Sequence, residues 1–295
     1  MTRLLNYLGL GFIALLSILP ISWAIGFGKL IGLLAYHLPI ERNKVVLINL
    51  RLCFPNLTDG ELKKLAKDHW KLLGKSLGER GHLWMGSENT IRKLIKVEST
   101  VDLNDGQPRV FVGMHMIGIE AGLIGLSIYL RDKEIKNPIT LYVRMKNHFF
   151  DQKIKSWRER FGARMLLRLH STRELLREIR NGSFVLLSPD MDLGLQDSVF
   201  VPFFGVPTCT VTSISRLAQL GKAQVCPVVT TLNPDGKTYT CRIGNPWENF
   251  PSDDIVADTT RMNHFFEQQV LKNPPEYYWV HKRFKNRPEG QARVY

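Results

Sequence analysis

The feature that most constrains this chain is an uncharged segment near its start, from Leu4 to Gly28. As one helix, 25 residues extend about 37 Å, which exceeds the roughly 30 Å of a bilayer's hydrocarbon core. Pro20 interrupts the segment, and proline removes a backbone donor inside a helix. The sequence therefore predicts a hydrophobic membrane anchor, either one spanning helix or a broken helix lying in one leaflet.

A cleavable signal peptide is the alternative for this segment. Arg3, the apolar run and residues 22–24 (Ser-Trp-Ala) fit that pattern loosely. However, the apolar character continues from Ile25 to Leu34, beyond the point where a signal peptide ends. We therefore expect a retained anchor over residues 1–38. The basic residues that follow favour the cytosolic side for the rest of the chain.

The net charge calls for an anionic partner. The 295 residues include 40 Lys and Arg against 27 Asp and Glu, a formal charge of +13. Nucleic acid, an acidic protein and a phosphate-bearing membrane all satisfy this excess. Four cysteines with no paired spacing exclude a disulfide scaffold and match no zinc site, so we expect no metal.

A basic amphipathic helix is predicted after the anchor. Thr58 and Glu61 form a capping-box pattern, and leucines, Ala66 and Trp70 then recur at helical spacing up to Leu77. Lysines from Lys63 to Lys75 occupy the positions between them. This stripe is either a solvated face opposite the core or a face that also lies against an anionic bilayer.

From about residue 97, short β-rich runs alternate with helical patterns. This alternation predicts a single α/β domain over residues 39–295, with a mostly parallel mixed sheet flanked by helices. The expected strands are 109–114, 139–143, 183–188, 224–230 and 238–243. The expected helices are 118–131, 149–162, 172–181, 210–221 and 254–272.

The first of these strands leads into a histidine and a glutamate in otherwise apolar sequence. His115 follows the strand directly, and Glu120 comes five residues later. Ionisable groups in such a setting need a partner or a cleft. A carboxylate beside an imidazole fixes its tautomer and stabilises the imidazolium. Since no Gly-x-Ser-x-Gly elbow is present, the pattern favours a histidine base acting on a hydroxyl that the substrate supplies.

Strand, His-x4-acid and apolar helix behind an N-terminal anchor resemble the glycerolipid acyltransferase superfamily. More narrowly, the chain resembles the late acyltransferases of lipid A biosynthesis, the lauroyl and myristoyl transferases of Gram-negative bacteria. Four further blocks carry this resemblance: 51–55 (Arg-Leu-Cys-Phe-Pro), 189–194 (Pro-Asp-Met-Asp-Leu-Gly), 198–207 (Ser-Val-Phe-Val-Pro-Phe-Phe-Gly-Val-Pro) and 279–288 (Trp-Val-His-Lys-Arg-Phe-Lys-Asn-Arg-Pro). Together they cover nearly the whole chain.

The resemblance implies a glycerolipid-acyltransferase-like fold and transfer of an acyl chain, without a cofactor, from acyl carrier protein to a hydroxyl of an acyl chain on the lipid A precursor. It implies that His115 is the general base and that Glu120 orients it. The resemblance further implies substrate-binding roles for five residues: Arg144, Asn147, Arg158, Arg160 and Asp190. Arg158 and Arg160 compete for one family position. Independently, arginine is the preferred bidentate ligand of phosphate, which the lipid A precursor carries.

The implied partners are acyl carrier protein, the lipid A precursor and lipids of the bacterial inner membrane, with the catalytic domain on the cytoplasmic face. An acyltransferase of the same superfamily that acts on a lysophospholipid is the alternative. A basic, non-enzymatic membrane or nucleic-acid-binding protein is a second alternative. The sequence shows no recognition module for nucleic acid, and nucleic acid leaves the anchor unexplained, so we expect no nucleic-acid partner.

Overall fold

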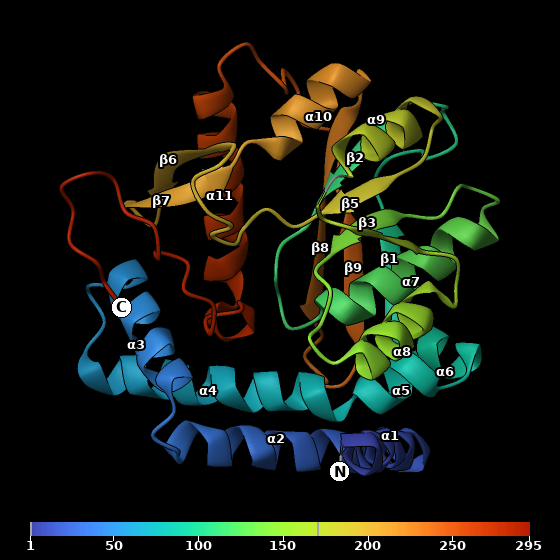
Figure 1. Ribbon diagram of the computed structural model, residues 1–295, viewed down its shortest axis with the longest axis vertical. Coiled ribbons are helices and arrows are strands. Elements are labelled where there is room, and N and C mark those ends of the chain that lie inside the picture. The colour runs from blue at the N-terminus through green and yellow to red at the C-terminus, as the bar shows by residue number, and fades with distance from the viewer. Residues whose placement is uncertain (1, 170) are drawn as a thin grey trace.

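The fold is built on a seven-stranded sheet that is parallel except for one pair (Figure 1). The computed structural model describes residues 2–169 and 171–295. From one edge to the other, the strands are β1 (Ile95–Ser99), β9 (Tyr239–Ile243), β8 (Gln224–Leu232), β2 (Arg109–Val112), β5 (Val185–Leu187), β3 (Ile139–Tyr142) and β4 (Arg164–Leu167). Only β8 and β9 pair antiparallel. The predicted mostly parallel mixed sheet is confirmed.

Helices cover both faces of this sheet, because side chains along each strand alternate between two cores. Val110 and Val112 of β2 belong to one core, and Phe111 belongs to the other. The helices around the sheet are α7 (Ile119–Asp132), α8 (His148–Glu159), α9 (Thr172–Arg180), α10 (Ser213–Gly221) and α11 (Ile255–Lys272). Helix α7 packs on β1, β8 and β9, whereas α10 packs on β2 and β8 from the opposite face.

Two strands of the main sheet and one hairpin lie outside the predicted strands. Both β1 and β4 are edge strands of four or five residues, half exposed to solvent, so their apolar signal is weak. Arg164 lies on β4 and pairs with Glu174 and Glu178 of α9. The hairpin consists of β6 (Ser198–Phe203) and β7 (Val206–Val211). A helix was predicted over 210–221. Residues 210–211 instead form the end of β7, and α10 begins at Ser213.

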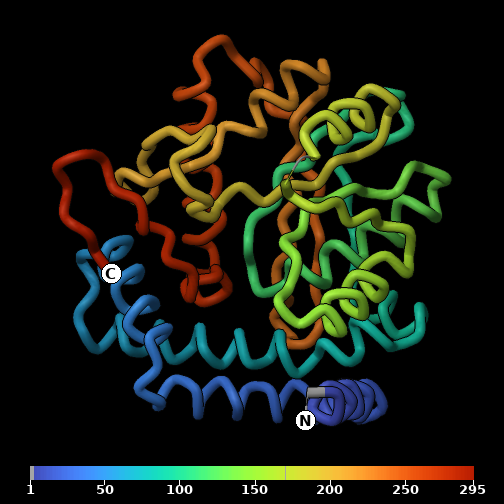
Figure 2. The backbone as a smooth tube through the Cα atoms, in the orientation of Figure 1, coloured from blue at the N-terminus to red at the C-terminus, as the bar shows by residue number. Residues whose placement is uncertain are grey.

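The N-terminal third of the chain is helical and forms a separate layer beneath the sheet (Figures 1 and 2). Its helices are α1 (Thr2–Ile18), α2 (Ile21–His37), α3 (Glu41–Cys53), α4 (Asp59–Gly78), α5 (Arg80–Met85) and α6 (Glu88–Leu94). The apolar segment is broken before Pro20, and α2 then continues beyond Gly28. Helix α4 lies between α2 and the sheet, and α1 packs against α5.

By length and composition, none of the described helices is by itself long and apolar enough to cross a bilayer. The bent pair of α2 and α3 meets that measure only jointly, with 86° between the two helices.

Helices α2 and α4 pack antiparallel with their backbones in contact. A Cβ atom on Gly28 would overlap the carbonyl oxygen of Gly74, and one on Gly74 would overlap that of Gly28. Only glycine allows this approach, and close packing of two backbones maximises dispersion contacts along the helices. The apolar segment is therefore fixed to the rest of the fold through α4.

The predicted capping box of α4 is confirmed, and so is its apolar stripe up to Leu73, whereas Leu77 at its end is 55% exposed. Thr58 N donates to Glu61 Oε2 (2.7 Å), Glu61 N donates to Thr58 Oγ1 (3.3 Å), and Leu62, Ala66 and Trp70 are buried. The lysine stripe is not one solvated or lipid-facing surface. Lys75 is fully buried and bonds Glu79 and the hydroxyl of Tyr239. Because Lys75 is buried against the sheet, it faces neither solvent nor a bilayer.

We predict that Gly74→Ala lowers the free energy of unfolding by about 2 kcal/mol, because the new methyl group overpacks the α2–α4 contact. Gly26→Ala is the matched control, since no atom lies within 4 Å of a Cβ built there. In a helix interior that change should stabilise by about 0.5–1 kcal/mol. Chemical denaturation in detergent measures both values. Equal effects of the two substitutions would contradict the close approach.

Candidate active site

The site is built where two neighbouring parallel strands, β2 and β5, end at the same edge of the sheet. His115 follows β2 and Asp190 follows β5. Asp190 accepts two hydrogen bonds from this residue: the His115 backbone N–H donates to Oδ2 (2.8 Å), and ring Nδ1 lies 2.7 Å from Oδ1. The carboxylate is buried, while the imidazole is 28% exposed. The ring is therefore held from the protein side and accessible on the other.

This contact sets the tautomer of His115. Burial raises the pKa of the Asp190 carboxyl, but the charge and hydrogen bonds of His115 outweigh burial and leave that pKa below its usual value. An ionised carboxylate only accepts hydrogen bonds, so Nδ1 carries the proton. In the neutral form of the ring, Nε2 then keeps its lone pair, which is the arrangement that a general base needs.

Glu120 has a different set of partners, and the prediction that it orients His115 is wrong. Its carboxylate accepts from Trp84 Nε1 (2.8 Å) and from Arg158 Nε and Nη2 (2.8 and 2.6 Å). Arg80 Nη1 lies 2.5 Å from Oε2. The start of α7 directs Glu120 toward α5 and α8, where two cations compensate its burial.

The two arginines keep Glu120 ionised. Burial raises the pKa of this carboxyl, but the charges of Arg80 and Arg158 outweigh burial and lower the pKa to about 2. The side chains of Arg158 and Arg80 are 29% and 19% exposed, so both cations of this ion pair are partly buried. The cluster is a charged element beside the histidine. Arg80 was not singled out from the sequence, because its single position on a short helix carries no motif.

The structure distinguishes Arg158 from Arg160. Arg158 pairs with Glu120, whereas Arg160 donates from Nη2 to the backbone oxygen of Leu83 (3.1 Å) and lies over the ring of Phe161. Arg158 thus belongs to the charged cluster. Arg160 joins the end of α8 to α5.

Arg144 and Asn147 follow β3, which pairs with β5. Arg144 is exposed and stays a predicted substrate ligand. Asn147 caps α8, since Oδ1 accepts from Phe149 N and Phe150 N, and its Nδ2 donates to Asn6 of α1 (2.8 Å). The amide therefore ties the first helix to the carboxyl edge of the sheet.

A C-terminal strap, residues 273–295, closes over the histidine loop. It includes the short helix η1 (Pro274–Glu276). Ile117 N donates to Glu276 O (2.8 Å), Tyr278 N donates to His115 O (3.0 Å), and the buried hydroxyl of Tyr277 donates to Asp190 O (3.2 Å). Thus the strap holds the backbone of both members of the His115–Asp190 pair. The sequence carries no local signal for these contacts.

The same strap also fixes the loop after Asp190. Asp192 accepts from Asn286 N (2.7 Å) and Asn286 Nδ2 (2.6 Å), and its backbone N–H donates to His281 Nε2 (3.0 Å). Burial lowers the pKa of His281 to about 4, so its ring is neutral at pH 7 and accepts this bond. Asp192 and Asn286 both lie in the sequence blocks that carry the family resemblance. They are 94 residues apart, so only the tertiary structure shows that they pair.

The structure thus places a carboxylate-held histidine at the carboxyl edge of a mostly parallel α/β sheet. The family described as "Bacterial lipid A biosynthesis acyltransferase" matches residues 1–286, so the chain belongs to that family. The protein is an acyltransferase, and the predicted family is confirmed.

Characterised relatives are similar over almost their full lengths. The lipid A biosynthesis lauroyltransferase of Escherichia coli K12 is 30% identical over 97% of this chain and 93% of its own. A lipid A biosynthesis acyltransferase of Haemophilus influenzae is 32% identical over 92% of this chain and 87% of its own. The 1-acyl-sn-glycerophosphate acyltransferase PlsC of Thermotoga maritima aligns with a TM-score of 0.37 and 14% identity, covering 78% of this chain and 95% of that one.

We predict that Glu120→Gln lowers the free energy of unfolding by about 3 kcal/mol at pH 7, because two partly buried cations lose their anion. The pKa of Glu120 is lowered from 4.5 to about 2, so its contribution is fully present above pH 4.5 and is lost as the pH falls toward 2. The difference between the two proteins in chemical denaturation should therefore be smaller at pH 3 than at pH 7. Glu289→Gln, at an exposed position, is the control and should change little. A pH-independent difference would contradict the ion-pair assignment.

We also predict that Asn286→Ala lowers kcat about tenfold with KM unchanged within twofold. The variant loses the Nδ2 bond to Asp192 but keeps the backbone bond, so the Asp190 loop loosens without unfolding. Steady-state acyl transfer measures both constants. Asn104→Ala, at an exposed position away from the strap, is the control. A rise in KM at constant kcat would exclude a positioning role.

Proposed function

We propose that this acyltransferase transfers a fatty acyl chain of the lauroyl or myristoyl class from acyl carrier protein to a hydroxyl of an acyl chain on a lipid A precursor. One observation carries the chemistry: His115 is held by Asp190 at the carboxyl edge of the sheet with its outer nitrogen free. Membership of the lipid A acyltransferase family supports the acceptor.

In this reaction, Nε2 of His115 removes the proton from the acceptor hydroxyl. The oxygen attacks the thioester carbonyl, an ester C–O bond forms and the C–S bond breaks. The proton passes from the imidazolium to the departing sulfur, which leaves as the thiol of the carrier protein. Asp190 stabilises the imidazolium between these two transfers, since its carboxylate remains ionised.

The arginines support binding of a phosphorylated acceptor. Arg144 is exposed after β3, and Arg158, whose side chain is 29% exposed, is fixed in position by Glu120. Guanidinium groups bind phosphate oxygens in bidentate geometry. We assign the acceptor phosphates to these two arginines. The pairing of Arg160 with Leu83 O makes that residue a support for α8.

The exposed apolar side chains of α1 and α2 support attachment to the cytoplasmic face of the bacterial inner membrane. They occur along both helices, as at Leu8 (60%), Trp23 (69%) and Leu34 (58%). Since α2 packs against α4 on its other side, we propose that both helices lie in one leaflet. We propose that this membrane-attached segment extends to about residue 38, since α2 ends at His37.

We predict that His115→Ala lowers acyl transfer about a thousandfold with the fold intact, because the base is lost. His148→Ala, at an exposed histidine on α8, is the control and should retain activity. The assay combines purified protein in detergent, acyl-loaded carrier protein and either a lipid A precursor or a lysophospholipid. Near-normal transfer by His115→Ala would contradict the mechanism. Transfer only to the lysophospholipid would contradict the acceptor.

A further inference from the structure

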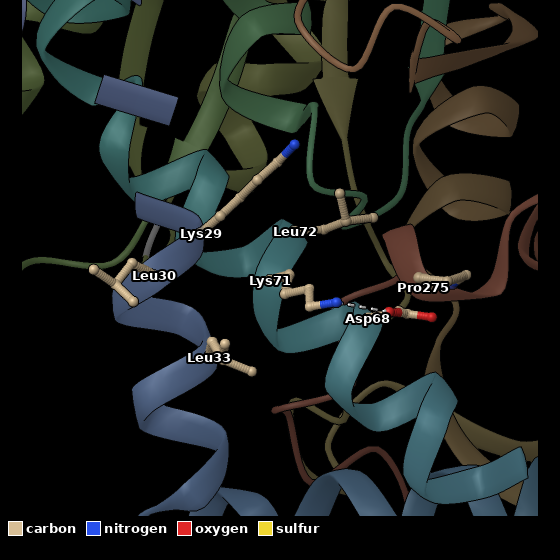
Figure 3. A pocket seen from close by; sticks show the side chains of 7 residues that line it. All are labelled: Lys29, Leu30, Leu33, Asp68, Lys71, Leu72 and Pro275. Carbon is tan, nitrogen blue, oxygen red and sulfur yellow. Dashed lines mark hydrogen bonds and ion pairs between the residues drawn. The ribbon is translucent and has the colours of Figure 1, made fainter. Parts of the chain in front are cut away.

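A pocket lies away from the catalytic edge, where α2, α4 and η1 meet (Figure 3). Its volume is about 610 Å³, within the range of small-ligand sites. It is lined by Lys29, Leu30, Leu33, Asp68, Lys71, Leu72 and Pro275. None of these residues takes part in the proposed reaction.

One cation in this pocket has no anionic partner. Asp68 is shared by Lys64 (2.9 Å) and Lys71 (3.5 Å), which leaves the lining with a net positive charge. For Lys29, the described part of the chain offers no carboxylate within ion-pair distance. Its ammonium group instead lies about 4 Å from where a Cβ on Gly236 would sit. The nearest buried lysine, Lys75, is already paired with Glu79.

The other walls of the pocket are apolar and continue onto the outer surface of α2. Leu30 is 53% exposed and borders the same surface as Trp23, Phe27 and Leu34. Figure 3 shows Lys29, Leu30 and Leu33 on α2 and the Lys71–Asp68 pair on α4, with the ammonium group of Lys29 pointing away from that pair. A cation is thus placed at the boundary between an apolar face and the body of the protein.

We propose that this pocket binds one anionic phospholipid. Its phosphate is held by Lys29 and Lys71, and an acyl chain lies along Leu30 and Leu33. An unpaired ammonium beside hydrocarbon is costly, and a lipid phosphate at that depth neutralises it. A zwitterionic lipid brings its own cation and neutralises it less well. The proposal rests on the proposed attachment of α1 and α2 to a membrane.

Such a lipid would fix the protein's height and orientation against the bilayer. Pro275 forms one wall of the pocket, and the next residue, Glu276, accepts a hydrogen bond from Ile117 close to His115. The lipid site and the histidine loop are therefore joined by one short rigid segment. The bound lipid would hold the site at a constant distance from the leaflet that supplies the acceptor.

Native mass spectrometry of the full chain, purified in detergent, tests the proposal. The probes are dioleoyl phosphatidylglycerol, dioleoyl phosphatidylcholine and inorganic phosphate, each added separately. We expect one phosphatidylglycerol to be retained in preference to phosphatidylcholine. Lys29→Ala should lower that retention at least fivefold, and Lys29→Arg should preserve it. Lys44→Ala, an exposed lysine on α3, changes the net charge equally and should have no effect.

Three results would overturn the proposal: equal retention of the two lipids, equal effects of Lys29→Ala and Lys44→Ala, or binding of inorganic phosphate with displacement of the lipid. Acyl transfer in detergent is measured in parallel and should be unchanged in Lys29→Ala. If the wild-type protein retains the two lipids equally but transfers acyl chains normally, only the lipid site is rejected. Absence of transfer in the wild-type protein rejects the proposed function, whatever the lipid retention shows.

Discussion

The hydrogen-bonded pair of His115 and Asp190 depends on the pairing of β2 with β5. Parallel neighbours end at the same edge of a sheet, so a loop from each strand meets the other there. Burying the Asp190 carboxylate is costly, and that cost is offset by two hydrogen bonds from His115. The C-terminal strap then holds both loops through Tyr277, Tyr278 and Asn286. If β2 and β5 did not pair in this register, the buried carboxylate of Asp190 would lose its contact with His115.

Glu120, Arg80 and Arg158 form a second, partly buried ion-pair cluster, separate from the His115–Asp190 pair. Arg80 and Arg158 come from different helices and meet one carboxylate that is otherwise in an apolar environment. Because two cations surround one anion, the cluster keeps a net positive charge beside the histidine. A site for a phosphorylated acceptor benefits from this excess. The same pairing fixes α5 and α8 to the start of α7, so structural support and charge placement are achieved by one contact.

The helical layer beneath the sheet shows that part of the chain's formal charge of +13 is not available to a partner. A stripe of lysines on α4 was predicted to face solvent or lipid, but α2 covers part of that helix, and Lys75 is buried with Glu79 and Tyr239. The close approach of Gly28 and Gly74 makes this cover possible. Exposed apolar side chains are frequent on α1 and α2, and α2 also carries a lysine. This lysine, Lys29, lacks an internal partner among the described residues.

The sequence alone determined the alternation of strands and helices, the capping box of α4, the family and the position of His115 after a strand. These follow from local periodicity and from motifs that are contiguous in the chain. Tertiary structure decided which carboxylate meets the histidine. Glu120 is near in sequence, but the start of α7 directs it toward two arginines. Asp190 is 75 residues away, and sheet pairing brings it into contact. The edge strands β1 and β4 and the strap contacts were likewise unpredictable, because their stabilising partners are distant along the chain and local sequence carries no record of them.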